Sequence, residues 1–269
     1  MTLLGRITPN AMLAAQDRYF APGVLMPFAD DLARRIARLS IGPLLEIAAG
    51  TGVLTQAIAS ALSMGMTIVA TDPDAEMVAH ATGKPGMARV IWQQANPHAL
   101  PFNDAAFGIV ACQFGLATLG DPVGVFKQAR RVMKQGGRFV FSVLGTVAEN
   151  PAADCVQSAL EEFFPTKPPR FIADILHGYA GADAIDDDLT DAGFTDAIYT
   201  TVELPFAAAS ARDVATGYCL GTSLRSDLEP RTDGNTEPVI QAVIGALEAR
   251  FGTGPVKTTM RAHVVSAAG

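Results

Sequence analysis

Short apolar runs alternate with helical patterns between about residues 40 and 145 of this chain. Such an alternation is typical of a parallel sheet whose strands are joined by crossover helices. The apolar runs predict strands at Leu44–Ala48, Thr67–Thr71, Val90–Gln94, Gly108–Gln113 and Arg138–Val143. The helical patterns between them lie at Thr55–Ser63, Ala75–Ala81 and Pro122–Met133. We expect the last of these helices to carry Lys134 in its final turn and to stop at Gly136 and Gly137, with a strand beginning at once.

Two more strand-like segments follow nearer the C-terminus, at Ala197–Leu204 and Thr258–Ser266. Helical patterns near Ala211–Leu220 and Pro238–Phe251 separate them. With these additions the pattern predicts an α/β fold with a doubly wound, seven-stranded and mostly parallel sheet.

The segments that flank the sheet pattern are helical. Residues 1–40 are expected to form an N-terminal helical cover, with two helices in Asn10–Leu39 that bend at Ala21-Pro22-Gly23 and Pro27. Residues 146–190 carry an acidic helical pattern around a Pro-rich stretch, which favours an insertion or lid. We expect residues 1–269 to form a single domain.

Composition and charge narrow the classes of partner. The net charge of −7 would repel a polyanion, so nucleic acid and anionic membranes are not expected as partners. No apolar run reaches the roughly 18 residues that span a bilayer. The three cysteines form no C-x-x-C pair, so a metal site is not expected. Because Met1–Arg6 lacks the features of an export signal, we expect a cytoplasmic protein that acts on a small molecule.

The densest chemical signal is the turn that follows the first strand. The strand from Leu44 runs into Ala49-Gly50-Thr51-Gly52 and then into a helix. Glycines let the backbone approach a ligand, and the helix start offers free N–H groups. About twenty residues later Asp72 ends the second strand, where a carboxylate can accept both hydroxyls of a ribose. These features predict an adenosine site at the carboxyl edge of the sheet.

Two residues favour a cationic ligand over a dinucleotide. The nicotinamide fingerprint has a third small residue where this chain has Thr55. Glu46 would attract an ammonium or sulfonium group and would repel a pyrophosphate. No Tyr-x-x-x-Lys pair is present to relay protons. An NAD(P)-dependent oxidoreductase therefore stays open only as an alternative that rests on the glycine turn.

Five segments of the chain carry a family resemblance. The first two are Glu46-Ile-Ala-Ala-Gly-Thr-Gly52 and Asp72-Pro-Asp-Ala-Glu-Met77. The third is Gln94–Phe102, which ends in Leu-Pro-Phe, and the last two are Phe107–Leu116 and Ala129–Arg138. In this order and spacing the segments resemble the motifs of the class I methyltransferases, especially the small-molecule branch typified by ubiquinone and menaquinone biosynthesis.

The resemblance implies a Rossmann-like methyltransferase fold with an antiparallel last strand, and S-adenosylmethionine as cofactor. The methyl group would pass to a small-molecule acceptor by in-line displacement, for which the protein supplies alignment and exclusion of water. The implied cofactor-binding residues are Glu46, Ala48, Gly50, Thr51, Gly52, Asp72, Pro73, Met77, Asn96, Pro97, His98, Gln113 and Phe114. Glu46 would meet the methionine end, Asp72 the ribose, and Gln113 with Phe114 the methyl end. Met77, Asn96 and Phe102 would frame the adenine.

Departures from the family pattern leave a second alternative open. Asn96 stands where the family usually has an acid, Gly108 replaces an Asp, and Gln135 replaces a Pro. These changes allow a catalytically silent S-adenosylmethionine-binding or scaffold protein.

Residues beyond the motifs are candidates for the acceptor side. His98 and His177 are the candidates for a general base. Tyr19 and Phe20 are candidate substrate contacts in the N-terminal cover. A homodimer through the cover helices is one arrangement that the sequence leaves open.

Overall fold

The computed structural model describes residues 9–39 and 41–269 and divides the chain into two compact units. The first, which we call the sheet unit, comprises Phe28–Thr146, Ile175–Glu203 and Arg261–Gly269. The second, which we call the helical unit, comprises Val147–Asp174, Leu204–Met260 and the described part of residues 1–27. The segment expected as an insertion, 146–190, is therefore shared between the units. That residues 1–269 act as a single domain stays a prediction.

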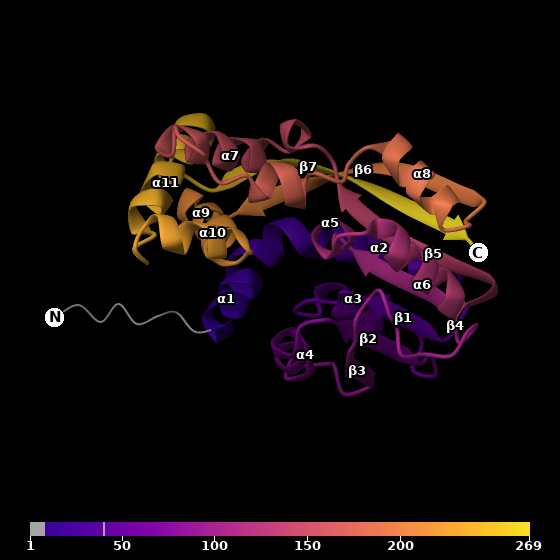
Figure 1. Ribbon diagram of the computed structural model, residues 1–269. Helices are drawn as coiled ribbons and strands as arrows, with labels where there is room; N and C mark the ends of the chain where they lie inside the picture. Colours follow the sequence, from indigo (N-terminus) through magenta and orange to yellow (C-terminus); the bar gives the residue numbers. More distant parts are fainter. Residues whose placement is uncertain (1–8, 40) are drawn as a thin grey trace. The chain divides into compact units, whose positions relative to one another are not determined.

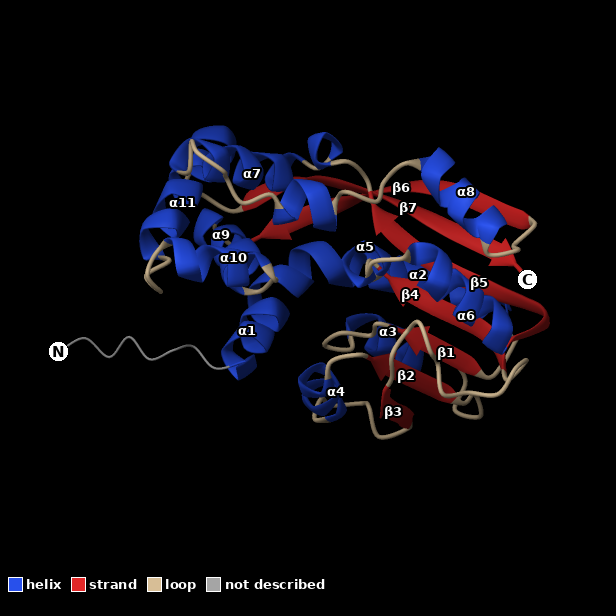
Figure 2. Cartoon of the chain, viewed as in Figure 1, coloured by secondary structure: helices blue, strands red, loops and turns tan. Residues whose placement is uncertain are grey.

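The predicted seven-stranded sheet is present and mostly parallel (Figures 1 and 2). Its strands follow the order β3-β2-β1-β4-β5-β7-β6. Their bounds are β1 Leu44–Ile47, β2 Ile68–Asp72, β3 Val90–Gln94, β4 Phe107–Gln113, β5 Met133–Leu144, β6 Asp196–Ala208 and β7 Val256–Ala268. Strand β7 pairs antiparallel with β5, as the family resemblance implied. The α/β doubly wound fold class is confirmed.

Helices of the sheet unit connect or cover these strands (Figure 2). They are α2 Met26–Leu39, α3 Val53–Ala61, α4 Ala75–Thr82, α5 Leu116–Leu119, α6 Pro122–Val132 and α8 Ala182–Asp191. One hydrophobic core lies between α6, α8 and the strands β1, β4, β5 and β7. Phe126 of α6 packs there against Phe139 and Phe141 of β5. This core fixes the strands whose carboxyl ends carry the motif residues.

The helical unit contains α1 Pro9–Ala15, the π-helix η1 Gln16–Leu25, α7 Pro151–Phe163, α9 Ala211–Leu220, α10 Leu224–Arg231 and α11 Glu237–Phe251. A short 3₁₀ turn, η2 Val147–Glu149, precedes α7, and a second π-helix, η3 Phe171–Leu176, follows it. Helix α10 was not predicted, because its charged sequence and internal Pro230 give a weak apolar pattern. No helix in the described ranges is long and apolar enough to cross a membrane.

Two boundary predictions were wrong. Helix α6 ends at Val132 and β5 begins at Met133, so Lys134 and Gly136 lie in the strand and not in or after the helix. Met133 pairs with Phe107 of β4, and the register then shifts before Ile109 meets Arg138. Gly136, at φ +74°, lies inside this irregular stretch. Early strand pairing therefore ends the helix before the glycines are reached.

Helical backbone runs through the segment in which a bend between two N-terminal helices was expected. Ala15 and Met26, which flank η1, both have right-handed helical dihedrals, so helical backbone continues past Pro22. The N–H of Met26 donates to the carbonyl oxygen of Ala21, five residues earlier. The wider π turn accommodates Pro22, which has no N–H to donate.

Candidate functional site

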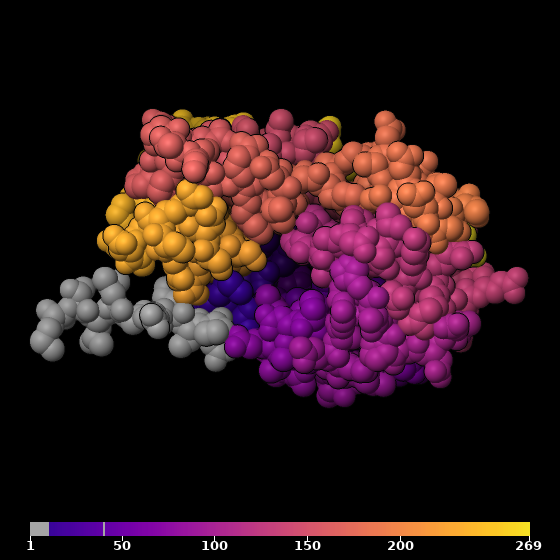
Figure 3. Space-filling view, in the orientation of Figure 1, coloured from indigo at the N-terminus to yellow at the C-terminus, as the bar shows by residue number. Residues whose placement is uncertain are grey.

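The carboxyl ends of β1, β2 and β4 meet at one edge of the sheet. The three strands are parallel and adjacent, with Ile47 beside Thr71 and Glu46 beside Ala111. Figure 3 shows the surface of the violet-to-magenta segment of the chain, which contains these three strands. In open α/β sheets this edge is where ligands bind. The predicted cofactor residues of β1, β2 and β4 are therefore brought to the same edge.

The turn after β1 has a backbone that favours glycine. Gly50 and Gly52 have φ values of +55° and +80°, and Gly52 is the N-cap of α3. A Cβ on Gly52 would lie 3.0 Å from the Trp92 ring, whereas a Cβ on Gly50 would meet nothing within 4 Å. Both the close approach of the Trp92 ring and the positive φ angle require glycine at position 52. Open space beside Gly50 leaves the backbone accessible to a ligand.

Asp72 at the end of β2 is held by two backbone N–H groups. Its Oδ2 accepts from Gly50 N at 2.8 Å, and its Oδ1 accepts from Asp74 N at 2.9 Å. The side chain is buried. Burial raises the pKa of Asp72 above its ordinary value, although the two N–H groups act in the opposite direction. The carboxylate is thus fixed beside the glycine turn with a rigid orientation.

Glu46 lies in β1 with only 1% of its surface exposed. Its Oε2 accepts a hydrogen bond from Thr55 Oγ1 at 2.7 Å, across the turn from α3. Burial raises the pKa of Glu46 to about 8, with a further rise from the charge of Asp72 and a partial offset from Thr55. Thr55 was noted only as a departure from the nicotinamide fingerprint, and its role as donor to Glu46 was missed.

Neither of these acids has a basic partner. In the part of the chain that the structure describes, no Lys, Arg or His forms an ion pair with Glu46 or Asp72. Because the pKa of Glu46 is raised to about 8, its carboxylate form gains most from a positive charge that a ligand brings beside the buried Asp72. Such a site favours a ligand that carries positive charge.

The segment after β3 forms a tight turn at the same edge. The N–H of Ala95 donates to the carbonyl oxygen of Asp72, and Asn96 Oδ1 accepts from His98 N at 2.9 Å. Asn96 is exposed and Pro97 is buried. His98 Nε2 lies 3.1 Å from the carbonyl oxygen of Gly120. One lone pair of the Asn96 amide oxygen is therefore already used inside the turn.

The end of β4 approaches the turn after β1 closely. Phe114 has a left-handed φ of +57°, and its N–H donates to Ser142 of β5. A Cβ on the next residue, Gly115, would lie 2.7 Å from the Cβ of Ala48. Phe114 is buried and packs edge-to-face on Phe28 at 5.5 Å. This contact brings Gln113 and Phe114 beside the glycine turn, a closeness the sequence does not reveal.

Other candidate residues have more ordinary surroundings. Pro73 is exposed and its carbonyl oxygen accepts from Gln94, while Met77 is half-buried on α4. Thr51 is buried, and its hydroxyl has no hydrogen-bond partner. Phe102 packs edge-to-face on Phe107 at the core. The roles of these side chains toward a cofactor stay predictions.

The two substrate candidates lie in the helical unit. Phe20 is buried and packs edge-to-face on Tyr218 of α9, with ring centroids 5.2 Å apart. Tyr19 is half-buried, with the guanidinium of Arg18 over its ring. Their contacts thus belong to packing within the helical unit, and a contact with substrate stays a prediction.

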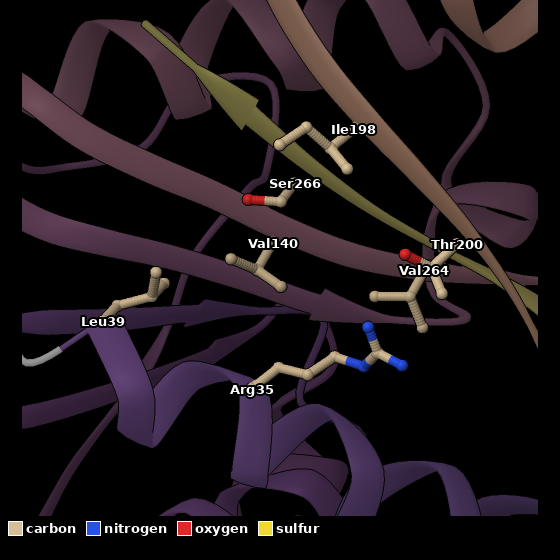
Figure 4. Close-up of a pocket in the computed structure, with 7 residues that line it drawn as sticks. All are labelled: Arg35, Leu39, Val140, Ile198, Thr200, Val264 and Ser266. Atoms are coloured by element: carbon tan, nitrogen blue, oxygen red, sulfur yellow. The ribbon is translucent and has the colours of Figure 1, made fainter.

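A hollow in the sheet unit lies away from the motif residues. It has a volume of about 130 Å³ and lies between α2 and the strands β5, β6 and β7 (Figure 4). Its wall consists of Arg35, Leu39, Val140, Ile198, Thr200, Val264 and Ser266. None of these is a candidate cofactor residue. Within the described residues, no group of three His, Cys, Asp or Glu side chains could hold a metal ion.

Comparisons with known proteins agree with this geometry. Residues 45–141 match the family model described as a methyltransferase domain. Over 109 residues the chain is 33% identical to the ubiquinone/menaquinone biosynthesis C-methyltransferase UbiE of Geotalea uraniireducens, covering 39% of this chain and 46% of that relative. It is 26% identical to the demethylmenaquinone methyltransferase of Renibacterium salmoninarum over 164 residues, 58% of this chain and 67% of that protein. The match therefore spans about half to two thirds of these relatives.

Solved structures show the same fold over more of the chain. The YcgJ protein of Bacillus subtilis aligns with a TM-score of 0.57 at 16% identity, covering 88% of this chain and 97% of that one. Residues 45–141 thus resemble the methyltransferase domain family, and the chain has the Rossmann-like fold of these solved structures. More particularly, its motif block resembles the ubiquinone and menaquinone C-methyltransferases, as the sequence motifs indicated.

Proposed function

We propose that this protein is an S-adenosylmethionine-dependent methyltransferase that acts on a small molecule. The observation that carries the proposal is the pair of buried carboxyl groups, Glu46 and Asp72, beside the open space at Gly50 and without a basic partner among the described residues. S-adenosylmethionine carries an ammonium and a sulfonium group, so it supplies the positive charge that the site lacks.

Each part of the site has a role in this proposal. Glu46 attracts the cationic methionine end, and Asp72 offers carboxylate oxygens to the ribose. The backbone at Gly50 lies against the sugar, and Gln113 with Phe114 border the methyl end. When bound, the cofactor supplies an activated methyl group. The protein aligns the acceptor with that group and excludes water.

The nicotinamide alternative fits the electrostatics poorly. A pyrophosphate would add negative charge beside two buried acids, where the cost of unpaired charge is greatest. Thr55, which occupies the third position of the fingerprint, donates to Glu46 and so has its own function in the turn.

Two of the three departures that favoured a catalytically silent scaffold protein lie away from the candidate site. Gly108 begins the regular part of β4 at the end opposite to Gln113, and a Cβ there would lie 2.5 Å from Ile41 and 3.0 Å from Gly42 N. The missing Asp is therefore a packing requirement remote from the cofactor edge. Gln135 lies in the irregular start of β5. Only Asn96 is a departure at the site itself.

Isothermal titration calorimetry tests cofactor binding. S-adenosylmethionine and S-adenosylhomocysteine should bind and NADH should not, and Asp72→Asn should weaken binding by at least about tenfold, equal to ~1.4 kcal/mol. Binding of NADH alone, or no binding of any of the three, would overturn the proposal.

Turnover tests the acceptor class. Because two relatives are named as menaquinone-pathway methyltransferases, the panel of acceptors begins with a reduced naphthoquinone and simple phenols. Formation of S-adenosylhomocysteine with methylated product supports an enzyme, whereas cofactor binding without turnover of any panel member favours the scaffold. We also expect a cytoplasmic location and test for a homodimer by light scattering.

A further inference from the structure

His177 is a buried histidine of the sheet unit with one ring nitrogen in use. It follows η3 directly and has 3% of its surface exposed. Its Nδ1 lies 2.7 Å from the carbonyl oxygen of Gly145. Because a carbonyl oxygen can only accept, Nδ1 must carry the proton. The neutral ring therefore has a bare lone pair on Nε2.

That lone pair has no partner. Nε2 of His177 is buried and forms no hydrogen bond with any described residue. Leaving a buried polar atom unsatisfied costs free energy, because the atom has lost its hydrogen bonds to water. An unsatisfied buried acceptor of this kind calls for an explanation, and a donor group that comes with a ligand would satisfy it.

His177 lies at the same edge of the sheet as the residues proposed to border the methyl end of the cofactor. Gly145 comes directly after β5, and Ser142 of β5 pairs with Gln113 of β4. Gly145 is three residue steps beyond Ser142, which is roughly 10 Å along the strand direction. His177 is thus held at the carboxyl edge of the sheet, beyond the strand end that carries Gln113 and Phe114.

The charge state also suits a proton acceptor. Burial lowers the pKa of His177 below the ordinary 6.5, and the bond to Gly145 offsets this only in part. No charged side chain of the described chain is among the causes of the shift. The ring is therefore neutral near physiological pH.

The other histidines are less suited to accept a proton from a bound ligand. The Nε2 of His98 lies against Gly120, and Nδ1 of His263 lies 3.1 Å from Thr201 Oγ1 in an exposed pair. His80 lies on α4, which packs against β2 and β3. Of the two base candidates in the sequence, the structure favours His177.

We propose that His177 is the general base of the methyl transfer, with Nε2 accepting the proton of the acceptor's O–H or N–H group. This inference rests on the proposed function. As the acceptor atom, or a carbon conjugated to it, bonds to the methyl carbon, the methyl–sulfur bond breaks and sulfur keeps the electron pair. The proton passes to Nε2 and later to water. Nδ1 keeps its proton throughout, and Gly145 stabilises the imidazolium that forms.

A first experiment needs no ligand. Nitrogen-15 NMR of histidine-labelled full-length protein, with the His177 signals assigned from the His177→Asn variant, reports the tautomer directly. We expect a neutral ring protonated at Nδ1 near neutral pH and a pKa below 6.5. A ring protonated at Nε2, or an imidazolium at neutral pH, would overturn the proposal.

A second experiment measures catalysis with the acceptor found in the turnover panel. His177→Asn keeps an amide N–H that can donate to Gly145 but removes the lone pair. We expect kcat to fall by about 10²–10⁴-fold. The acid limb of the pH–rate profile should disappear, while S-adenosylmethionine affinity and the melting temperature stay near those of the wild type. His263→Asn, which changes a half-buried histidine whose Nδ1 is hydrogen-bonded to Thr201 Oγ1, is the matched control.

The outcomes separate the two proposals. Wild-type turnover by His177→Asn, with an unchanged acid limb, overturns the base and leaves methyl transfer standing. Failure of the wild-type protein to bind S-adenosylmethionine overturns the proposed function itself. If His177→Asn does not fold, His177→Gln replaces it in the kinetic experiment, and the tautomer and pKa of the wild-type ring are measured with assignments from variants of the other three histidines.

Discussion

At the scale of single residues, the pair Glu46 and Thr55 decides the chemistry of the candidate site. A buried carboxyl group in β1 receives its only described hydrogen bond from a helix hydroxyl nine positions later. Thr71 supports the same strand by donating from its hydroxyl to the Glu46 carbonyl oxygen at 2.9 Å. The acid is therefore held in place, and burial keeps its proton bound up to a pKa of about 8.

Removing the Thr55 hydroxyl tests this arrangement. Thr55→Val should lower the free energy of unfolding by about 1–3 kcal/mol, because Glu46 is left buried without a donor. It should also raise the pKa of Glu46 and weaken S-adenosylmethionine binding. Thr51→Val is the stability control, since its buried hydroxyl has no partner to lose. Equal effects of the two substitutions in urea unfolding would contradict the role of Thr55.

The raised pKa of Glu46 predicts a pH dependence of defined sign. Between pH 4.5 and about 8 the folded protein keeps a proton that the unfolded chain has lost, so this group's contribution to stability decreases as pH rises through that window.

A cationic ligand prefers the carboxylate, so S-adenosylmethionine should bind more tightly as pH rises toward 8 and should release a proton. Calorimetry in buffers of different ionisation enthalpy measures that proton. Glu46→Gln should abolish both effects, and a pH-dependent Kd in this variant would refute the assignment.

At the scale of elements, the π-helix η1 and α9 of the helical unit approach each other closely at two glycines. A Cβ on Gly217 would lie 2.8 Å from the carbonyl oxygen of Tyr19. One on Gly221 would lie 2.9 Å from Gln16 Cα. Small residues four positions apart thus let the two backbones touch. The same contact orients Phe20 onto Tyr218.

A glycine-to-alanine pair tests the contact. Gly217→Ala should destabilise the protein by about 1–3 kcal/mol, because the backbone of η1 must move to admit the methyl group. Gly245→Ala in α11 meets nothing within 4 Å and should stabilise by roughly 0.5–1 kcal/mol through helix propensity. Thermal unfolding compares the two, and stabilisation by Gly217→Ala would show that the helices do not approach this closely.

At the scale of the whole molecule, the core of the sheet unit holds the strands that form the site. Phe126 contacts the rings of Phe139, Phe141 and Phe194, at centroid distances of 5.6, 5.4 and 6.5 Å. These residues come from α6, β5 and the turn before β6. The core thus joins the motif block to the C-terminal part of the sheet.

Truncating the central ring tests its contribution. Phe126→Ala should lower the free energy of unfolding by about 3–5 kcal/mol, through lost transfer energy and the cavity left behind. Met64→Ala, at a side chain 82% exposed, should change it by less than about 0.5 kcal/mol. Urea denaturation measures both free energies of unfolding. If Phe126→Ala lowered the free energy no more than Met64→Ala does, the packing of Phe126 would be contradicted.

The sequence by itself determined the sheet and which residues lie at its carboxyl edge. Period-two and period-3.6 patterns are local, so strand Val90–Gln94 and helix Ala211–Leu220 could be predicted at their observed bounds. The glycine turn could also be predicted, because positive φ and close approach select glycine whatever surrounds it. Asp72 followed from its place at a strand end.

Tertiary structure alone decided which side chains meet. The hydrogen bond from Thr55 to Glu46, the packing demand on Gly108 and the tautomer of His177 depend on residues that only folding brings together. The early end of α6 has the same origin, since pairing of Met133 with Phe107 overrides the local stop at Gly136. Local patterns encode backbone preference, but contact between distant residues is a property of the packed chain.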